Sequence, residues 1–370
     1  FTLPVTGGLA TGTYTLAVEA RDSLSSLSFP LRAYVFVRGL SATLAVASDR
    51  EVYAAGEPVM AAAALLNTGA PFADAVLEWS VTGAAAIEPI AFAGTVHVST
   101  AGNDTFGDGS IALPFATPQR GVDAAPSGHR VLLRAGTYSG TITLRPGTIL
   151  QGEVAAGEPA AVIADADILG DTGVVVDHLG LRNGNVVFSS PVADVRVTDC
   201  VLEGGVRAAA PRGQGLVFPQ GGSRVLIGRN RLTGYRAGRA GVQFFGPAAD
   251  LLVHENVFSD FPGQGNNGVY LGAAADRVTV QGNTFSTLGG GGNGVQVWGD
   301  AAPIRTLRVL NNRFSSMTGG SNGVHVWEHA ESVDVRGNRF SALEGACGGI
   351  HLWEASLAAN LSATSLADLR

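Results

Sequence analysis

A short apolar motif recurs at nearly constant spacing through the second half of the chain, and no other feature constrains the fold as strongly. Its copies are GLVFPQ at 215, GVQFFG at 241, GVYLGA at 268, GVQVWG at 294, GVHVWE at 323 and GIHLWE at 349. From residue 241 onward the glycine-to-glycine steps are 27, 26, 29 and 26 residues. A repeat of this length, with short apolar strands and Gly or Asn turns, predicts a solenoid in which each repeat stacks on its neighbours.

A second pattern, V-x-V-x-x-N-x-F, lies between the copies and completes the repeat. Its asparagines are Asn230, Asn256, Asn283, Asn312 and Asn338, and Cys200 stands where the preceding one would fall. We interpret each repeat as three strands, GVxVW, VxV and a short NxF arm, with successive coils ~4.8 Å apart. The asparagines are predicted to form a ladder at one turn, because Asn tolerates a left-handed backbone and bonds its neighbours. An internal aromatic column is predicted from Phe258, Phe285, Phe314 and Phe340.

One repeat contains the letters of a zinc-enzyme signature, H-x-x-E-H, in His325, Glu328 and His329. The signature requires a helix, on which residues four apart share one face. The alternation Val-His-Val-Trp from residue 324 is typical of a strand instead. On a strand the two histidines lie about four steps of ~3.3 Å apart, too far for one ion. We therefore predict a strand here and no metal ligand set.

These repeats resemble the right-handed parallel β-helix superfamily, which has the pectate-lyase-like fold. The segment 96–143 adds to the resemblance, with a G-x-D loop, the letters PF-x-T, an expected short capping helix near 117–125 and a strand ending in a G-x-Y turn. Thr117 is placed to cap that helix and Pro118 to open it. The resemblance covers residues 95–370 and implies an all-β, right-handed parallel β-helix with three strands per coil, which we expect to continue beyond residue 370. The same scaffold carries lyases, hydrolases, epimerases, adhesins and tailspikes, so it fixes no function.

The preceding residues resemble bacterial immunoglobulin-like modules. Residues 1–40 resemble the C-terminal half of such a β-sandwich, and residues 41–94 resemble the N-terminal half, with the turn letters Y-x-x-G-E-P-V. An unpaired half would expose strand edges. The two halves therefore either form one domain or are completed by a neighbour.

Composition limits the chemistry and the partners. All 24 basic residues are arginine, so an enzyme on this scaffold has no lysine to use as a base. The two cysteines, Cys200 and Cys347, lie between five and six coils apart in the expected register and should not pair. No apolar run reaches membrane-spanning length, so we expect no membrane insertion in this segment. The modular build favours an extracellular or cell-surface bacterial protein.

The outward positions of the GVxVW strands carry the candidate binding residues. One row contains Gln243, Tyr270, Gln296, His325 and His351, and the next contains Phe245, Gly272, Trp298, Trp327 and Trp353. Aromatic side chains stack on sugar rings and also anchor protein interfaces. Glycan binding, contact with a neighbouring copy, and packing beneath loops all remain open for this exposed aromatic row.

The same face supplies the candidate catalytic residues, which are Tyr270, His325, His351, Glu328 and Glu354. The two glutamates occupy equivalent places one coil apart, where they can hold calcium or divide acid and base roles. Two solvated turn residues are the simpler interpretation. We interpret the remaining acidic clusters as turns; they are Asp104 and Asp108, and Asp165, Asp167 and Asp171. No cofactor is predicted, with calcium as the alternative.

Arginines are concentrated between residues 196 and 239. Four of them lie in two loops that flank the aromatic row: Arg207, Arg212, Arg236 and Arg239. Arginine forks suit carboxylates and sulfates, which favours an acidic polysaccharide, although a solvated arginine-rich surface explains the pattern equally well. No nucleic-acid motif is present and the aromatics lie away from these loops, so we expect no nucleic acid partner.

Two functions follow from these observations. The first is a structural or adhesive β-solenoid, such as a component of an extracellular fibre, whose aromatic face contacts glycan or neighbouring copies of itself. The second is a polysaccharide lyase or glycoside hydrolase acting on an acidic polysaccharide. The family lyases pair calcium-binding aspartates with a basic residue, and that set has no counterpart here, so the sequence favours the non-enzymatic function.

Overall fold

A computed structural model describes residues 90–204, 215–235, 241–261, 265–298, 303–327, 330–344 and 348–353, together with the strands β1 to β6, β37 and β38. The chain divides into two compact units, Phe1–Pro89 and Ile90–Arg370, and each is considered by itself.

The first unit contains two three-stranded antiparallel sheets, ordered β1-β6-β3 and β2-β5-β4. The strands are β1 (Thr2–Val5), β2 (Gly12–Arg21), β3 (Ala33–Phe36), β4 (Ala42–Ser48), β5 (Pro58–Asn67) and β6 (Ala75–Trp79). Each sheet combines strands from both segments that resemble sandwich halves.

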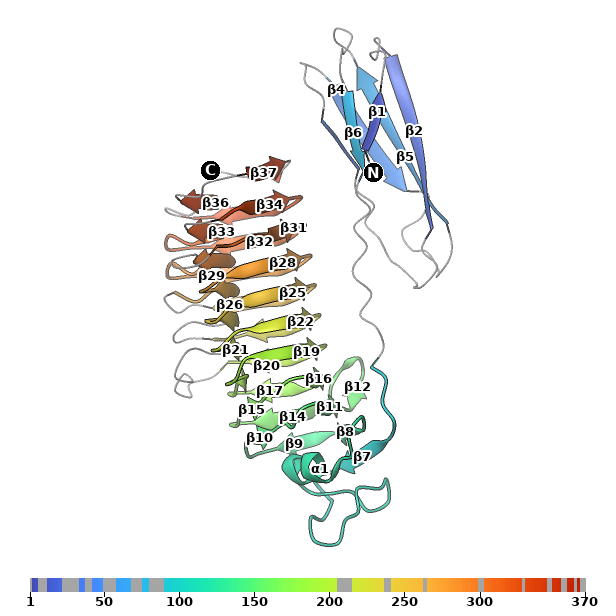
Figure 1. Ribbon diagram of the computed structural model, residues 1–370, viewed down its shortest axis with the longest axis vertical. Helices are drawn as coiled ribbons and strands as arrows, with labels where there is room; N and C mark the ends of the chain where they lie inside the picture. The colour runs from blue at the N-terminus through green and yellow to red at the C-terminus, as the bar shows by residue number, and fades with distance from the viewer. Residues whose placement is uncertain are drawn as a thin grey trace. The chain divides into compact units, whose positions relative to one another are not determined.

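The second unit is a right-handed parallel β-helix with three parallel sheets, which we name A, B and C (Figure 1). Sheet A contains β7 (Thr95–Val98), β8 (Arg130–Leu133), β11 (Ile149–Gly152), β16 (Val175–Asp177), β19 (Val192–Thr198), β22 (Gly222–Gly228), β25 (Ala248–His254), β28 (Ala275–Gln281), β31 (Leu307–Leu310), β34 (Ser332–Arg336) and β37 (Ala358–Ser362). These are the VxV strands of the repeat.

Sheets B and C hold the other two strands of each coil. Sheet B contains β9 (Gly136–Tyr138), β14 (Ala161–Ala164), β17 (Gly180–Arg182), β20 (Val201–Glu203), β23 (Arg231–Thr233), β26 (Val257–Phe261), β29 (Thr284–Leu288), β32 (Arg313–Met317), β35 (Arg339–Leu343) and β38 (Ser365–Leu366). Sheet C contains β10 (Ile142–Thr143), β15 (Ile168–Leu169), β18 (Val186–Val187), β21 (Leu216–Phe218), β24 (Val242–Phe244), β27 (Val269–Leu271), β30 (Val295–Trp298), β33 (Asn322–Trp327) and β36 (Gly348–Trp353). A short hairpin, β12 (Val154–Ala155) with β13 (Glu158–Pro159), stands outside these sheets.

The predicted capping helix is confirmed as α1 (Pro118–Ala124), which lies at the first coil (Figure 1). The Thr117 hydroxyl accepts a hydrogen bond from the backbone N–H of Arg120, and Pro118 opens the first turn. The helix packs closely, because a Cβ added at Gly121 would lie 2.5 Å from the Val98 side chain. The helix therefore covers the apolar interior at this end of the stack.

The predicted aromatic column is also confirmed. The rings of Phe258, Phe285, Phe314 and Phe340 stack with centroids 4.8 to 4.9 Å apart and near-parallel planes. A second column, which the sequence reading missed, runs through Phe188, Phe218 and Phe244 on the inner face of sheet C. Its signal was present in the letters GLVF and GVQF.

The asparagine ladder occupies the turn from sheet A to sheet B, as predicted. The ladder runs from Asn230 to Asn338, and each Oδ1 after the first accepts from the backbone N–H of the asparagine one coil earlier at 2.9 Å; these acceptors are Asn256, Asn283, Asn312 and Asn338. The backbone N–H of Cys200 donates to Asn230 Oδ1 and so begins the ladder. A second, unforeseen ladder at the turn from B to C joins Asn267, Asn293 and Asn322, which precede the repeated letters GV.

Two further expectations concern function. β33 is a strand through His325, which confirms that the zinc signature has no helix to support it, while Glu328 and His329 lie outside the described residues. Within the described part of the chain, no helix has the length and apolar character needed to cross a membrane.

Candidate functional site

The outward face of sheet C places the predicted row in register, one residue per coil. Gln243 pairs with Tyr270, and the row continues through Gln296, His325 and His351. The expectation that this face is open is wrong for most of the row. Gln243 is 0% exposed, Tyr270 8% and His325 9%. The accessible part of the face is therefore formed by half-buried residues, which are Gln296 and His351 of this row and members of the adjacent aromatic row.

Trp298 and Trp327 stand next to this row and stack on each other. Their ring centroids are 4.9 Å apart and the planes differ by 3°. Each indole therefore turns one face to the other, and both side chains remain half-buried. The ring faces that Trp298 and Trp327 turn toward each other are therefore not open to a ligand, in contrast to the row of flat exposed faces that the sequence suggested.

Tyr270 closes the gap that glycine leaves in the aromatic row. A Cβ added at Gly272 would lie 2.7 Å from Tyr270 Cε1 and 2.8 Å from its hydroxyl oxygen, so the phenol ring lies over this glycine. On the other side the ring packs against Phe245 at 5.5 Å, with the planes tilted by 52°. We name the resulting series the aromatic strip: Phe245, Tyr270, Trp298 and Trp327.

The two histidines of the row form a stacked pair. Their centroids are 4.8 Å apart with planes at 8°, and His325 also meets Trp327 edge-on at 5.6 Å. Burial, and secondarily the neighbouring His351, lowers the pKa of His325 below its usual value. The ring is therefore neutral at pH 7, and its buried Nε2 has no hydrogen-bond partner in the described parts of the chain.

The second asparagine ladder reaches this row. Asn293 donates from Nδ2 to Gln296 Oε1 at 3.3 Å, while its own Oδ1 accepts from the backbone N–H of Asn322. The amide of Gln296 is thus oriented by the turn between sheets B and C. We name Gln296, His325 and His351 the polar row.

Several predicted site residues lie outside the described residues. These are Glu328, Glu354, Arg207, Arg212, Arg236 and Arg239. Trp353 belongs to β36, in register with Trp327, and its side chain is likewise not described. Cys347 also lies outside, whereas Cys200 is buried and free.

The acidic residues that were predicted to lie in turns accept hydrogen bonds from nearby backbone and side-chain groups. Asp104 accepts from the backbone N–H groups of Ala116 and Thr117, and Asp108 accepts from that of Ser110. Farther on, Asp165 and Asp167 accept from the side-chain amides of Asn183 and Asn185, and Asp171 accepts from the N–H of Thr172.

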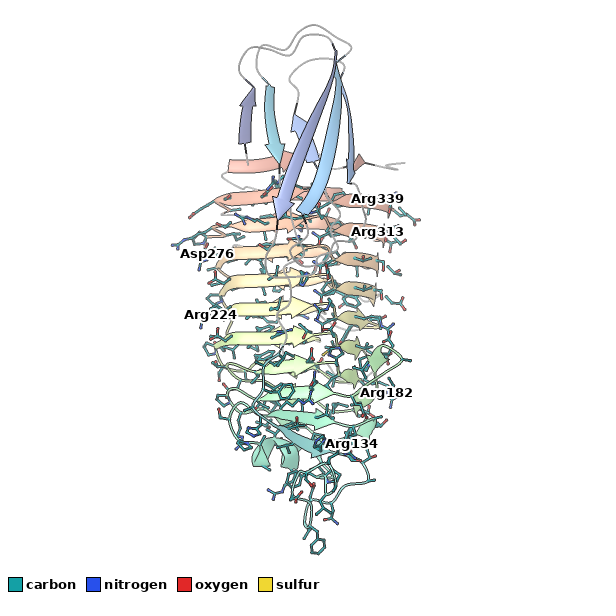
Figure 2. All side chains as sticks on the ribbon, turned by 90° about the vertical axis from the view of Figure 1, so that its right-hand side faces the viewer. Arg134, Arg182, Arg224, Asp276, Arg313 and Arg339 are labelled. Atoms are coloured by element: carbon teal, nitrogen blue, oxygen red, sulfur yellow. The ribbon has the colours of Figure 1, made fainter. Side chains whose placement is uncertain are left out.

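The excess positive charge expected between residues 196 and 239 is partly compensated. Arg224 makes a bidentate ion pair with Asp194, and Arg229 makes one with Asp199. Arg231 lies 3.5 Å from Glu158. Arg224 and Arg229 are therefore paired with carboxylates one coil earlier, and Arg231 reaches the hairpin of β12 and β13. Figure 2 shows Arg224 and Asp276 at one edge of the stack and Arg313 and Arg339 at the other.

Comparison with solved structures finds β-helix enzymes at low identity. The catalytic unit of a thermostable alpha-1,3-glucanase from Streptomyces thermodiastaticus is 16% identical, with 94% of this chain and 61% of that chain covered and a TM-score of 0.39. A pectate lyase is 14% identical, with 75% and 80% covered and a TM-score of 0.36. A rhamnogalacturonan lyase is 13% identical, with 67% and 74% covered and a TM-score of 0.37.

The chain thus spans 61% of the length of the glucanase catalytic unit. A search of curated proteins finds no match. Residues 180–362 match the family described as the right handed beta helix region, in agreement with the three parallel sheets of the unit Ile90–Arg370.

Proposed function

We propose that the β-helix binds an extended polysaccharide along the outward face of sheet C. The observation that carries the proposal is the aromatic strip, which places one aromatic side chain on each of four consecutive coils beside the hydrogen-bonding polar row. Sugar rings are amphipathic, so a surface with an apolar edge and an adjacent line of amide and imidazole groups suits them.

The dimensions of the face suit a polymer. The aromatic strip spans four coils, hence three steps of ~4.8 Å or ~14 Å. A repeating surface offers the same contacts at each step, which a repeating ligand can use in turn. Affinity then accumulates from several modest contacts rather than from one deep pocket.

Selection between neutral and acidic glycans would depend on the loops that flank this face. The polar row is neutral at His325, so it does not select charge. Arg207, Arg212, Arg236 and Arg239 would add that selection in favour of an acidic polysaccharide. We retain the acidic glycan as part of the proposal.

The wider setting is an extracellular adhesive or fibre-forming protein of the bacterial cell surface. An immunoglobulin-like first unit, as its sequence resemblance implies, would present the β-helix there. The outward face of sheet C is also the surface through which neighbouring copies of the chain would meet. Glycan binding and self-association can be separated by experiment.

The test is a titration of tryptophan fluorescence with neutral, uronate and sulfated polysaccharides. Saturable quenching is expected, and Trp327→Ala should weaken binding about tenfold, which corresponds to about 1.4 kcal/mol. Phe106→Ala is the matched control, because this aromatic side chain is 79% exposed in a loop far along the chain from the strip. Equal binding by wild type and Trp327→Ala would reject the aromatic strip as the binding surface. Concentration-dependent assembly without glycan binding would favour contact between copies.

A polysaccharide lyase is the second candidate, and the stacked pair of His325 and His351 on the outward face of sheet C is the observation that favours it. In that reaction a base removes the proton from C5 of a uronate, the C4–O4 bond breaks and a C4=C5 double bond forms. His325→Ala should then abolish formation of the unsaturated product while leaving polysaccharide binding measurable. Absence of unsaturated product from wild type, across a panel of uronates, would reject this candidate.

A further inference from the structure

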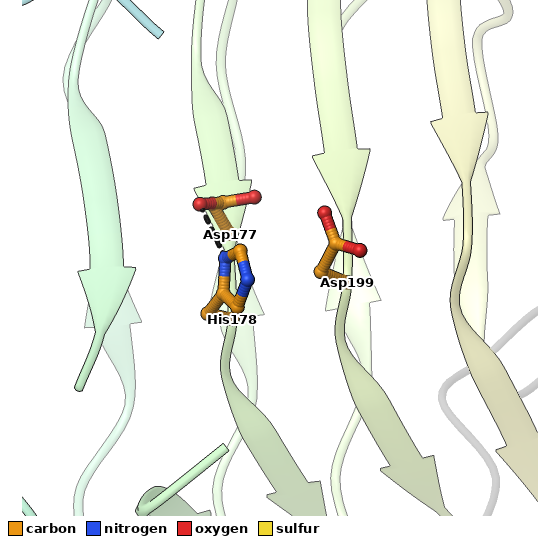
Figure 3. Close-up of side chains that lie close together, drawn as sticks. All are labelled: Asp177, His178 and Asp199. Atoms are coloured by element: carbon orange, nitrogen blue, oxygen red, sulfur yellow. Dashed lines mark hydrogen bonds and ion pairs between the residues drawn. The ribbon is translucent and has the colours of Figure 1, made fainter. Parts of the chain in front are cut away.

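We infer that Asp177, His178 and Asp199 form a binding site for a divalent transition-metal cation of the zinc class. Their ligand atoms all lie within 4.8 Å of one another, at the turn from sheet A to sheet B (Figure 3). The site stands apart from the face of sheet C and does not depend on the proposed function. The sequence reading missed it because the residues come from two coils and match no ligand spacing.

The coil stacking brings these three residues together. Asp177 ends β16, and His178 follows it in the left-handed region, with φ at 50°. One coil later Thr198 pairs with Asp177, and Asp199 follows in the same backbone conformation, with φ at 54°. His178 and Asp199 are therefore equivalent residues of adjacent coils, and their side chains leave the turn in the same direction (Figure 3).

Neighbouring groups hold the carboxylate of Asp177 in place. Its side chain is only 3% exposed. Oδ1 accepts from the Thr198 hydroxyl at 2.5 Å, and Oδ2 accepts from Gln151 Nε2 at 2.8 Å. Gln151 in turn accepts from Arg130 through Oε1. A buried carboxylate with a hydrogen-bond donor on each oxygen is held in one orientation, as a pre-arranged metal ligand requires.

The histidine supplies the preference for a transition metal. Nδ1 of His178 lies 2.7 Å from Asp177 Oδ2, the distance of a bridging hydrogen. A cation that replaces this hydrogen leaves the imidazole neutral, with its proton on Nε2. One imidazole with two carboxylates is a donor set that zinc accepts, whereas calcium prefers oxygen ligands alone. Ligand atoms in a tetrahedral zinc site lie about 3.3 Å apart, so Asp199 must approach on binding.

The guanidinium of Arg229 competes with a metal cation for the carboxylate of Asp199. It donates from Nε and Nη2 to the two oxygens of Asp199, at 2.7 and 2.5 Å. The pair is partly exposed, with 38% of the arginine side chain accessible, so the guanidinium can move into solvent. Metal binding must displace it, and removal of Arg229 should therefore strengthen binding. A purely structural hydrogen-bond network gives no reason for that gain.

The experiment is isothermal titration of the full chain with Zn2+, followed by the same titration of single variants. His178→Asn should lose this site, since Asn tolerates the left-handed backbone but lacks the imidazole. Asp199→Asn should weaken binding at least tenfold, and Arg229→Gln should strengthen it about tenfold. His325→Ala is the control for Zn2+ binding by the stacked histidines of sheet C, and its Zn2+ affinity at the site of Asp177, His178 and Asp199 should be unchanged.

Three results would overturn the inference. They are no Zn2+ binding by the wild-type chain, unchanged binding by His178→Asn, and equal or weaker binding by Arg229→Gln. Displacement of Zn2+ by equimolar Ca2+ would overturn the assignment to the zinc class. Urea unfolding of each variant without metal checks that the fold is intact, and Asp199→Asn provides the decisive comparison if His178→Asn fails to fold.

Discussion

The early coils, through residue 204, and the later coils, from residue 215, hold the same turn together in different ways. In the later coils, identical asparagines repeat one above another and each bonds the next. In the early coils the row at the end of sheet A is mixed, with Gln151, Asp177 and Thr198 joined by side-chain hydrogen bonds. In the homogeneous ladder each asparagine side chain bonds the backbone of the preceding coil, and the row contains no charged group. A mixed row places charged and titratable groups side by side, and these can bind a cation.

One row shows the contrast directly, because it runs through both regions in register. It passes from Asp177 through Thr198 and Gly228 to His254. The carboxylate at the early end has hydrogen-bond donors on both oxygens. The histidine at the later end is buried, and its Nε2 has no partner among the described atoms. The same backbone position therefore holds a hydrogen-bonded carboxylate in one coil and a buried imidazole in another.

The largest expected effect is in the aromatic column of the later coils. Phe314→Ala removes a fully buried ring stacked between Phe285 and Phe340, and should cost about 3–5 kcal/mol of unfolding free energy. Urea denaturation measures it. Phe106→Ala, at an exposed site, should stay within about 0.5 kcal/mol of wild type. Equal losses in the two variants would contradict the role of the column.

The asparagine ladder should show the next largest effect. Asn283→Ala leaves the Val253 carbonyl and the Asn256 backbone N–H without their side-chain partners, and should cost about 3 kcal/mol. Cys200→Ala at the equivalent early position removes only thiol hydrogen bonds and should cost about 1 kcal/mol. The same denaturation experiment compares them. A larger loss at Cys200 would reverse the distinction drawn between the two regions.

A pH effect should follow from His254. Burial lowers the pKa of this imidazole below 6.5, although Glu255 opposes the shift. Between the lowered pKa and 6.5 the unfolded chain binds more protons, so the unfolding free energy falls as pH falls. The slope from this group is at most about 1.4 kcal/mol per pH unit, and nothing is lost above pH 6.5. His254→Gln should flatten the stability profile measured from pH 7 to 5, and an unchanged slope would assign the proton uptake to other groups.

The smallest expected effect is on polysaccharide affinity, and it tests whether the Tyr270 ring over Gly272 contributes to the aromatic strip. Gly272→Ala places a methyl group where the Tyr270 ring lies, and should displace that ring. Polysaccharide affinity should fall about threefold, or about 0.7 kcal/mol, in the fluorescence titration. Gly272→Ala combined with Tyr270→Ala should show no further loss from the methyl group. A full additional loss in the double variant would mean that the two residues act independently.

The repeat made much of the β-helix predictable from sequence. The strand at His325, the column through Phe314 and the ladder through Asn283 all follow from side-chain alternation and spacing within one repeat. The capping helix followed from Thr117 and Pro118 in the same local way. Each of these predictions depends on residues that are close in the chain, and the repeat pattern is therefore sufficient to make it.

The candidate sites were predictable only in part. The sequence predicted that Tyr270 and His325 lie in one row on sheet C. It did not predict that they are buried, because burial depends on how side chains at adjacent positions pack against them. Tyr270 over Gly272 is such a case. The stacking of Trp298 on Trp327 likewise decides which ring surfaces a ligand can reach.

The sequence by itself determined that this chain forms stacked three-stranded coils. The spacing of apolar residues is a local property of each repeat, and stacking the repeats buries all of these residues in one continuous core. Only the tertiary structure decided which side chains of different coils meet. Asp177 and Asp199 are twenty-two positions apart and come together because coils of unequal length stack in register. Register across coils is set by the summed packing of every turn, and no single stretch of sequence contains it.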